Sequence, residues 1–220
     1  MSIKAVIFDL DGTLVKFALD ITNARKEAIT EIKRIGINAE NLNNLNVYLM
    51  LKVIKSRIDA NTYLKLKQSV WRIVEKFELK ASKGVNIQPD ALNTLVFIKR
   101  LGLKLALVTN NGRKATYYII KKFNFDNFFD AIITREDSKE LKPDGLSIGR
   151  SIKILGIKSQ EAIYVGDSVI DVLAAKKAGV ISVALPTGIS RISDLVKTKP
   201  DFIIGSLQDM MDLINRYFHS

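Results

Sequence analysis

The chain alternates short apolar runs with longer segments in which apolar residues recur every three or four positions. The short runs are typical of buried parallel strands and cover residues 5–8, 103–108, 131–133, 162–165, 181–185 and 202–204. Helical periodicity covers residues 89–101, 146–155 and 171–178, each followed by a glycine, a common helix stop, and a last helix is predicted over 207–218. This alternation predicts an α/β fold with a doubly wound, mainly parallel, Rossmann-like sheet.

One long segment breaks the alternation. Between the first and second strands, residues 16–84 contain only helical patterns, over residues 21–35, 42–54 and 63–77. The single tryptophan, Trp71, fits the core of such a unit. We therefore expect an α/β core domain made of residues 1–15 and 85–220, with an all-α domain of residues 16–84 inserted into it.

Composition narrows the class of protein. The chain has 220 residues, of which 47% are hydrophobic, enough to fill a sizeable core. It has no cysteine, which excludes disulfides, thiolate metal sites and cysteine nucleophiles. Because no run of 18 uncharged apolar residues occurs and Asp9 interrupts the first apolar run, we expect neither a membrane span nor a signal peptide. A cytoplasmic location is the expectation.

The charge is strongly basic, with a formal net charge of +11. Residues 16–84 hold 14 Lys and Arg against 7 Asp and Glu, a net +7, so most of the excess lies in the helical segment. Such charge can attract an anionic small molecule or nucleic acid. No five basic residues are consecutive, and no stacking aromatics are interleaved with them, which favours solvated helix faces over a nucleic-acid surface.

Polar residues follow several predicted strands where the strands end. Asp9 and Asp11 follow the first strand, Thr109, Asn110 and Asn111 the second, Lys142 comes some way after the third, and Asp167 and Asp171 follow the fourth. Ligands of open α/β sheets bind beyond these carboxyl ends. Each residue alone has a structural explanation as a cap, turn or loop residue. Their joint placement after successive strands predicts one site.

The chemistry of this set is that of a phosphoryl group. Asp9, Asp11 and Asp167 could share Mg²⁺, which prefers oxygen ligands and needs few of them from the protein. Thr109 and nearby amides could hold the oxygens of an anion, which Lys142 would neutralise. Metal, ammonium and amide donors together describe a phosphoryl site.

Four motifs resemble those of the haloacid dehalogenase superfamily, and within it phosphatases similar to phosphoglycolate phosphatase. "VIFDLDGTLV" matches the first motif, "ALVTNNG" the second, "LKP" the third and "YVGDSVIDVLAAKKAGV" the fourth. The resemblance spans nearly the whole core, and the segment 16–84 is similar to the helical cap domain of that family. It implies a hydrolase of phosphoric monoesters.

The resemblance also implies roles for the residues. Asp9 would be the nucleophile that forms an aspartyl-phosphate, and Asp11 the general acid and base. Mg²⁺ would be held by Asp9, the main-chain carbonyl of Asp11, and Asp167. Thr109, the Asn110 amide and Lys142 would bind the phosphoryl oxygens. Asp171 would orient Lys142 or a metal-bound water from behind the ligands.

Other functions stay open at this point. Asp11 disfavours dehalogenation, because a halide leaving group needs no proton. A sugar phosphomutase similar to β-phosphoglucomutase would use the same acids and metal. A non-catalytic phospho-acceptor resembling receiver domains, or a polyanion-binding module, is a weaker alternative. The expected partner is a small phosphorylated metabolite, with no membrane and no nucleic acid, and both a monomer and a homodimer remain open.

Overall fold

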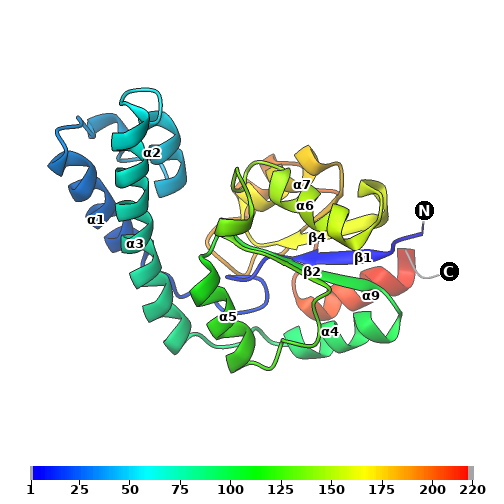
Figure 1. Ribbon diagram of the computed structural model, residues 1–220. Coiled ribbons are helices and arrows are strands. Elements are labelled where there is room, and N and C mark those ends of the chain that lie inside the picture. The colour runs from blue at the N-terminus through cyan, green and yellow to red at the C-terminus, as the bar shows by residue number, and fades with distance from the viewer. Residues whose placement is uncertain (1, 218–220) are drawn as a thin grey trace. The chain divides into compact units, whose positions relative to one another are not determined.

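The computed structural model describes residues 2–217, which fall into two compact units (Figure 1). The core unit comprises the described parts of Met1–Ala18 and Val85–Ser220, and the helical unit comprises Leu19–Gly84. Among the described residues, no helix is both long and apolar enough to cross a membrane.

The core unit is built on a parallel sheet with the strand order β3-β2-β1-β4-β5-β6. Its strands are β1 (Ala5–Phe8), β2 (Lys104–Val108), β3 (Ala131–Ile133), β4 (Ala162–Gly166), β5 (Ile181–Ala184) and β6 (Phe202–Ile203). All six match predicted apolar runs to within one residue at each end. The predicted fold class, a doubly wound parallel α/β sheet, is confirmed.

Helices cover both faces of this sheet (Figure 1). On one face, α4 (Ala91–Arg100), α5 (Arg113–Lys122) and α9 (Leu207–Tyr217) pack against Val6, Phe8 and their neighbours. On the other, α6 (Leu146–Leu155) and α7 (Val169–Ala178) pack against small strand residues such as Ala5 and Ala162. Because β1 is buried on both faces, its continuous apolar sequence fits the central position.

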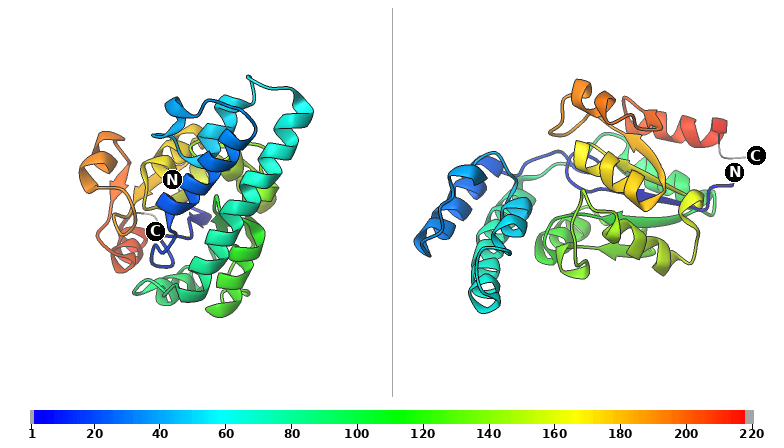
Figure 2. Two further views of the ribbon diagram at one scale, coloured as in Figure 1. Left: turned by 90° about the vertical axis from the view of Figure 1, so that its left-hand side faces the viewer. Right: turned by 90° about the horizontal axis from the view of Figure 1, so that it is seen from above.

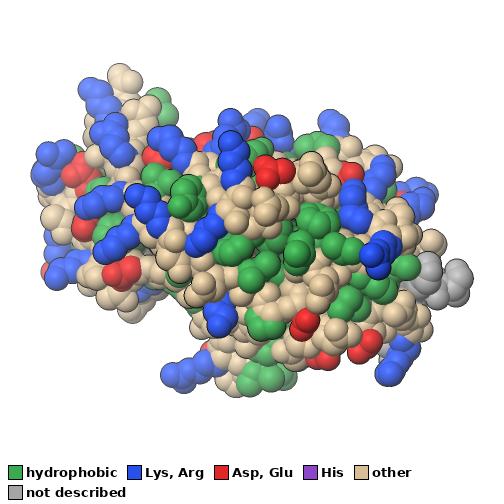
Figure 3. All heavy atoms as spheres, turned by 90° about the horizontal axis from the view of Figure 1, so that it is seen from below, with side chains coloured by type: hydrophobic (Ala, Val, Ile, Leu, Met, Phe, Trp, Pro, Cys, Tyr) green, Lys and Arg blue, Asp and Glu red, His purple; other side chains and the backbone are tan. Residues whose placement is uncertain are grey.

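The face drawn in Figure 3 shows the Lys and Arg side chains of the core unit spread out among hydrophobic and uncharged ones.

Several helix predictions needed correction. Helices α5 and α8 (Ile192–Lys197) were not predicted. In α5 the exposed Tyr117 and Tyr118 obscure the buried stripe formed by Ala115, Ile119 and Ile120. Helix α4 begins at Ala91 rather than 89, because Asp90 takes a left-handed conformation with φ 59°. Residue 218, the predicted end of the last helix, lies outside the described residues.

The helical unit contains three helices and no strand among its residues (Figure 2): α1 (Ile21–Arg34), α2 (Val47–Ile54) and α3 (Ala60–Gly84). They enclose a core that includes Ile32, Met50 and Val70, against which Trp71 packs as predicted. The segment predicted as one helix over 42–54 is divided into a 3-10 turn, Glu40–Leu42, and α2, because Asn46 caps α2 by accepting a hydrogen bond from the Leu49 amide. Helix α3 is longer than the predicted 63–77.

Candidate active site

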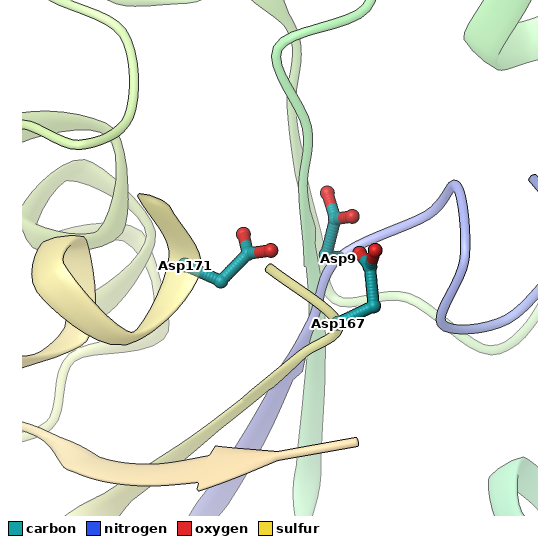
Figure 4. A group of neighbouring side chains, drawn as sticks. All are labelled: Asp9, Asp167 and Asp171. Carbon is teal, nitrogen blue, oxygen red and sulfur yellow. The ribbon is translucent and has the colours of Figure 1, made fainter. Parts of the chain in front are cut away.

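Three acidic side chains meet at the carboxyl edge of the sheet (Figure 4). Asp9 follows β1 and Asp167 follows β4; since these strands pair in parallel, with Phe8 opposite Val165, the two carboxylates leave the sheet side by side. Asp171 reaches the same place from the first turn of α7. The three residues are buried, and each offers a carboxylate oxygen within 4.8 Å of the others.

Lys142 links two of these acids. Its ammonium group donates to Asp9 Oδ1 and to Asp171 Oδ1, both at 2.6 Å, and to the hydroxyl of Tyr164 at 2.8 Å. The Lys142 residue is only 2% exposed, so these contacts replace water. Burial alone would lower the pKa of Lys142, but Asp171 and Asp9 outweigh it and raise the pKa above its ordinary value. Lys142 is therefore a permanent positive charge at the strand ends.

Asp171 is held on both of its oxygens. Oδ1 accepts from Lys142 and, at 3.0 Å, from the Tyr164 hydroxyl. Oδ2 accepts from the Ser168 amide at 3.1 Å, as part of a capping box at the start of α7, and also from the Ser168 hydroxyl. These contacts fix Asp171 as a support for Lys142 and leave Asp9 and Asp167 as the less engaged carboxylates of the cluster.

The donor set fits a hard divalent cation. Three carboxylates and one ammonium leave two negative charges in a buried site, and carboxylate oxygens are the ligands that Mg²⁺ prefers. Burial, only partly offset by Lys142, raises the pKa of Asp9, and the nearby Asp171 and Asp167 raise it further. Burial and Asp171 raise the pKa of Asp167 to about 7, against the opposing hydrogen bond from the Ile189 amide. Added positive charge beside Asp9 and Asp167 would relieve both shifts.

Two glycines allow the chain to close around Asp167. A Cβ atom on Gly12, whose φ is +83°, would lie 2.6 Å from the Asp167 carboxyl carbon, and one on Gly188 would lie 1.7 Å from Asp167 Oδ2. The Ile189 amide donates to the same Oδ2 at 3.0 Å. The Thr187 hydroxyl donates to the Gly12 carbonyl at 2.5 Å and thereby ties the loop after β5 to the loop after β1.

The side chains of the two asparagines after β2 contact different parts of the site. The side chain of Asn110 exchanges two hydrogen bonds with the main chain of Lys142, donating to its carbonyl at 3.1 Å and accepting from its amide at 3.0 Å. Thr109 Oγ1 accepts from the Asn111 amide at 3.1 Å, so its own proton can be donated to an anion. The Asn111 side-chain amide donates to Asp11 Oδ2.

The comparison with protein families decides the assignment of the chain. Residues 6–185 match the haloacid dehalogenase-like hydrolase family. The chain belongs to this family. The predicted recognition and the predicted hydrolase class are thereby confirmed, and the matched residues include all four motifs singled out in the sequence.

Relatives within the family are named phosphatases. The phosphoglycolate phosphatase of Pseudomonas savastanoi pv. phaseolicola is 27% identical and aligns with 94% of this chain and 78% of its own length. The glyceraldehyde 3-phosphate phosphatase of Methanocaldococcus jannaschii is 28% identical and aligns with 96% of this chain and 97% of its own. A hydrolase from Pseudomonas syringae, 22% identical, shares the fold with a TM-score of 0.71 over 98% of this chain and 99% of that one.

In this member of the haloacid dehalogenase-like hydrolases, the structure brings Asp9, Lys142, Asp167 and Asp171 together at one edge of the sheet. Sequence reasoning missed three features of this region. Tyr164 was assigned only to a strand, although its buried hydroxyl joins Lys142 to Asp171. Asn111 was noted after its strand without a role, although its side chain contacts Asp11. The closeness of Gly188 to Asp167 had no signal in the sequence, because it depends on how the loop after β5 folds back.

Proposed function

We propose that this protein is a Mg²⁺-dependent phosphomonoester phosphatase that acts on a small organic phosphate through an aspartyl-phosphate on Asp9. The observation that carries the proposal is the pairing of Asp9 with Lys142, 2.6 Å apart and buried, beside the carboxylate of Asp167. A carboxylate beside a fixed ammonium and a cation-binding carboxylate suits attack on a phosphoryl group, whose oxygens need positive charge around them.

Asp9 would supply the nucleophile and Asp11 the proton. A carboxylate oxygen of Asp9 forms the new bond to phosphorus while the ester P–O bond breaks, and Asp11 protonates the departing alkoxide. Asp11 then takes a proton from water, which attacks phosphorus, releases inorganic phosphate and restores the Asp9 carboxylate. The position of Asp11 two residues after Asp9, on the loop that leaves β1, supports this division of roles.

The phosphoryl oxygens would be held by Lys142, the Thr109 hydroxyl and the main-chain amide of Asn110. Lys142 is already placed at Asp9. The Asn110 side chain is occupied by the main chain of Lys142, so its backbone N–H is the group suited to an anion. The same side-chain contacts hold the main chain of Lys142 beside the end of β2, which Thr109 follows.

Asp9, Asp167 and the main-chain carbonyl of Asp11 would hold Mg²⁺. Asp171 is less suited to direct ligation, because both of its oxygens already accept hydrogen bonds from Lys142, Tyr164 and Ser168. A bound Mg²⁺ would supply charge neutralisation at the phosphoryl oxygens. Gly12 and Gly188 support this assignment, since they let the chain pack closely around Asp167.

We further propose that residues 16–84 act as a cap that restricts the site to small phosphate esters. The excess of Lys and Arg in this segment would favour anionic substrates. Relatives that align over more than nine-tenths of this chain are named phosphatases, which favours hydrolysis over a phosphomutase reaction.

The test is release of phosphate from p-nitrophenyl phosphate and from a panel of natural phosphate esters. We expect turnover with Mg²⁺, no turnover after EDTA, and a loss of at least about a thousandfold in Asp9→Asn, as for loss of a nucleophile. Asp126→Asn, at an exposed aspartate, is the matched control and should keep full activity.

Two outcomes would contradict the proposal. If no ester in the panel is hydrolysed with Mg²⁺, the protein is not a phosphatase of this kind. If phosphate on Asp9 accumulates without release to water and turns over only with a sugar bisphosphate, the phosphomutase alternative is correct.

A further inference from the structure

The side chain of Asn111 contacts the carboxylate of Asp11. Its Nδ2 group donates to Asp11 Oδ2. Asp11 lies in the loop after β1, and Asn111 lies in the loop after β2. These two strands pair in parallel, so their following loops lie at the same edge of the sheet. The contact therefore depends on the tertiary fold and is not a local turn.

The backbone of Asn111 is fixed on both sides. Its amide donates to Thr109 Oγ1 at 3.1 Å, and its carbonyl accepts from the Arg135 amide at 2.9 Å. Arg135 is itself 8% exposed and begins a 3-10 turn, Arg135–Asp137. Because these contacts use only the main chain of Asn111, its side chain is directed at Asp11 by a rigid frame and can be replaced without removing that frame.

We propose that Asn111 is a positioning residue that orients the carboxyl group of Asp11 for proton transfer to the leaving group. The inference rests on the proposed phosphatase function. In a neutral carboxyl group the unprotonated oxygen is the better acceptor for an amide N–H. By donating to Oδ2, Asn111 favours the form of the acid with its proton on Oδ1 and sets the direction in which that oxygen points.

The neighbouring Asn110 provides an internal contrast. Its side chain has the same chemistry, but it is paired with the main chain of Lys142 on the phosphoryl-binding side of the site. The two successive asparagines therefore support different parts of the reaction. Asn110 supports binding of the phosphoryl group, which every substrate has, and Asn111 supports protonation, which substrates need to different degrees.

This difference determines the substrates on which Asn111 matters. An alkoxide is a poor leaving group and needs a proton as the ester bond breaks, whereas p-nitrophenolate is stable without one. The value of kcat/KM reports the steps up to the first irreversible one, which here include cleavage of the ester. Loss of Asn111 should therefore make kcat/KM depend more steeply on the basicity of the leaving group.

The experiment measures kcat/KM for p-nitrophenyl phosphate, phenyl phosphate and an alkyl phosphate with the wild-type protein, Asn111→Ala and Asn110→Ala, all with Mg²⁺. For Asn111→Ala we expect a loss of about tenfold to a hundredfold on the alkyl ester, since an intact general acid contributes about 10²–10⁴-fold. The loss on p-nitrophenyl phosphate should stay below about threefold on the same reasoning. Asn110→Ala should reduce all three values by the same factor.

Two further variants serve as controls for misfolding and for indirect effects of the substitution. Asn111→Leu keeps a branched side chain of similar shape without the donor and should reproduce the steeper dependence. On an Asp11→Asn background, Asn111→Ala should steepen the dependence no further, because there is no acid left to orient.

The outcomes separate the inference from the function on which it rests. A parallel loss on all three substrates in Asn111→Ala and Asn111→Leu, or no loss, overturns the role of Asn111 while the phosphatase stands. A wild-type protein that hydrolyses none of the three esters, nor any natural phosphate ester, overturns the proposed function and the inference together.

Discussion

Replacing Gly188 by alanine should damage the candidate metal site directly. The added Cβ would lie 1.7 Å from Asp167 Oδ2 and 2.3 Å from its carboxyl carbon, whereas Cβ atoms essentially never approach closer than 3.0 Å. The loop after β5 and the Asp167 carboxylate must therefore separate by about 1.3 Å, the difference between these distances. A flexible surface side chain could swing away, but Asp167 is only 2% exposed and follows a central strand.

The expected losses of stability and of metal affinity can be calculated from the contacts of Asp167 that this separation disturbs. The Ile189 amide donates to Asp167 Oδ2 at 3.0 Å, and loss of a hydrogen bond to a charged group costs about 1.5–3 kcal/mol. In a chain of this length, that lowers Tm by roughly 4–10 °C. A misplaced support for a metal ligand weakens metal binding by about 10–100-fold, which corresponds to about 1.4–2.8 kcal/mol.

The assay is isothermal titration of Mg²⁺ into the metal-free protein, together with thermal unfolding without metal. The control is Gly149→Ala, at an exposed position in α6 where an added Cβ meets nothing within 4 Å. This control should bind Mg²⁺ normally and gain about 0.5–1 kcal/mol, because alanine favours the helix. Unchanged stability in Gly188→Ala would refute the packing of the loop on Asp167. Lower stability with unchanged Mg²⁺ affinity would refute Asp167 as a metal ligand.

Three further changes probe other parts of the chain. Tyr164→Phe removes a hydroxyl that accepts from Lys142 at 2.8 Å and donates to Asp171, so urea unfolding should show that the free energy of unfolding falls by about 1.5–3 kcal/mol. The control is Tyr118→Phe, at an exposed tyrosine, and an equally small loss in both variants would contradict this prediction. Partial burial raises the pKa of Asp130, but the Leu105 amide and Lys99 outweigh it and lower the pKa below its usual 3.8. A lowered pKa stabilises the fold above the unfolded-state value and loses this effect as the pH falls through the folded-state value. Asp130→Asn should therefore lower Tm at pH 7 but approach the wild-type Tm at strongly acidic pH, and a gap in Tm that stays constant with pH would refute it. Ile32→Ala creates a cavity at a residue that is fully buried in the helical unit, so hydrogen exchange should show residues 19–84 destabilised by about 2–5 kcal/mol. Its Mg²⁺ titration should match that of the wild-type protein, and a loss of Mg²⁺ binding would contradict the independence of the metal site.

The strands of the core unit could be predicted because their sequences are nearly continuous apolar runs. A strand such as Ala5–Phe8, buried on both faces, leaves little ambiguity about what it is. The candidate residues followed from the strands by a rule of chain direction, since parallel strands deliver the residues after their carboxyl ends to one edge. This is why Asp9, Thr109 and Asp167 could be grouped before any contact was known.

The features that were missed depend on register and loop conformation. Nothing in the sequence around Tyr164 shows that its hydroxyl meets Lys142, since the two residues are brought together only when the loop before α6 returns to β4. The contact between Asn111 and Asp11 likewise needs the pairing of β1 with β2. Helix α5 was missed for a local reason, because two exposed tyrosines in its middle make its buried stripe hard to distinguish.

The three carboxylates of the cluster differ in what neutralises them, and this difference is the physical reason for proposing a cation in addition to the lysine. Asp171 is matched by Lys142, whose contacts with Asp171 and Asp9 are equally short at 2.6 Å. One ammonium cannot balance both acids and Asp167 as well, and the raised pKa values of Asp9 and Asp167 are the physical result. Asp9 must be ionised to act as the proposed nucleophile, and burial, which raises its pKa, opposes this ionisation. A divalent cation held by Asp9 and Asp167 would remove that opposition. The buried cluster is unfavourable alone, and Asp9 would become ready to react once such a cation is bound.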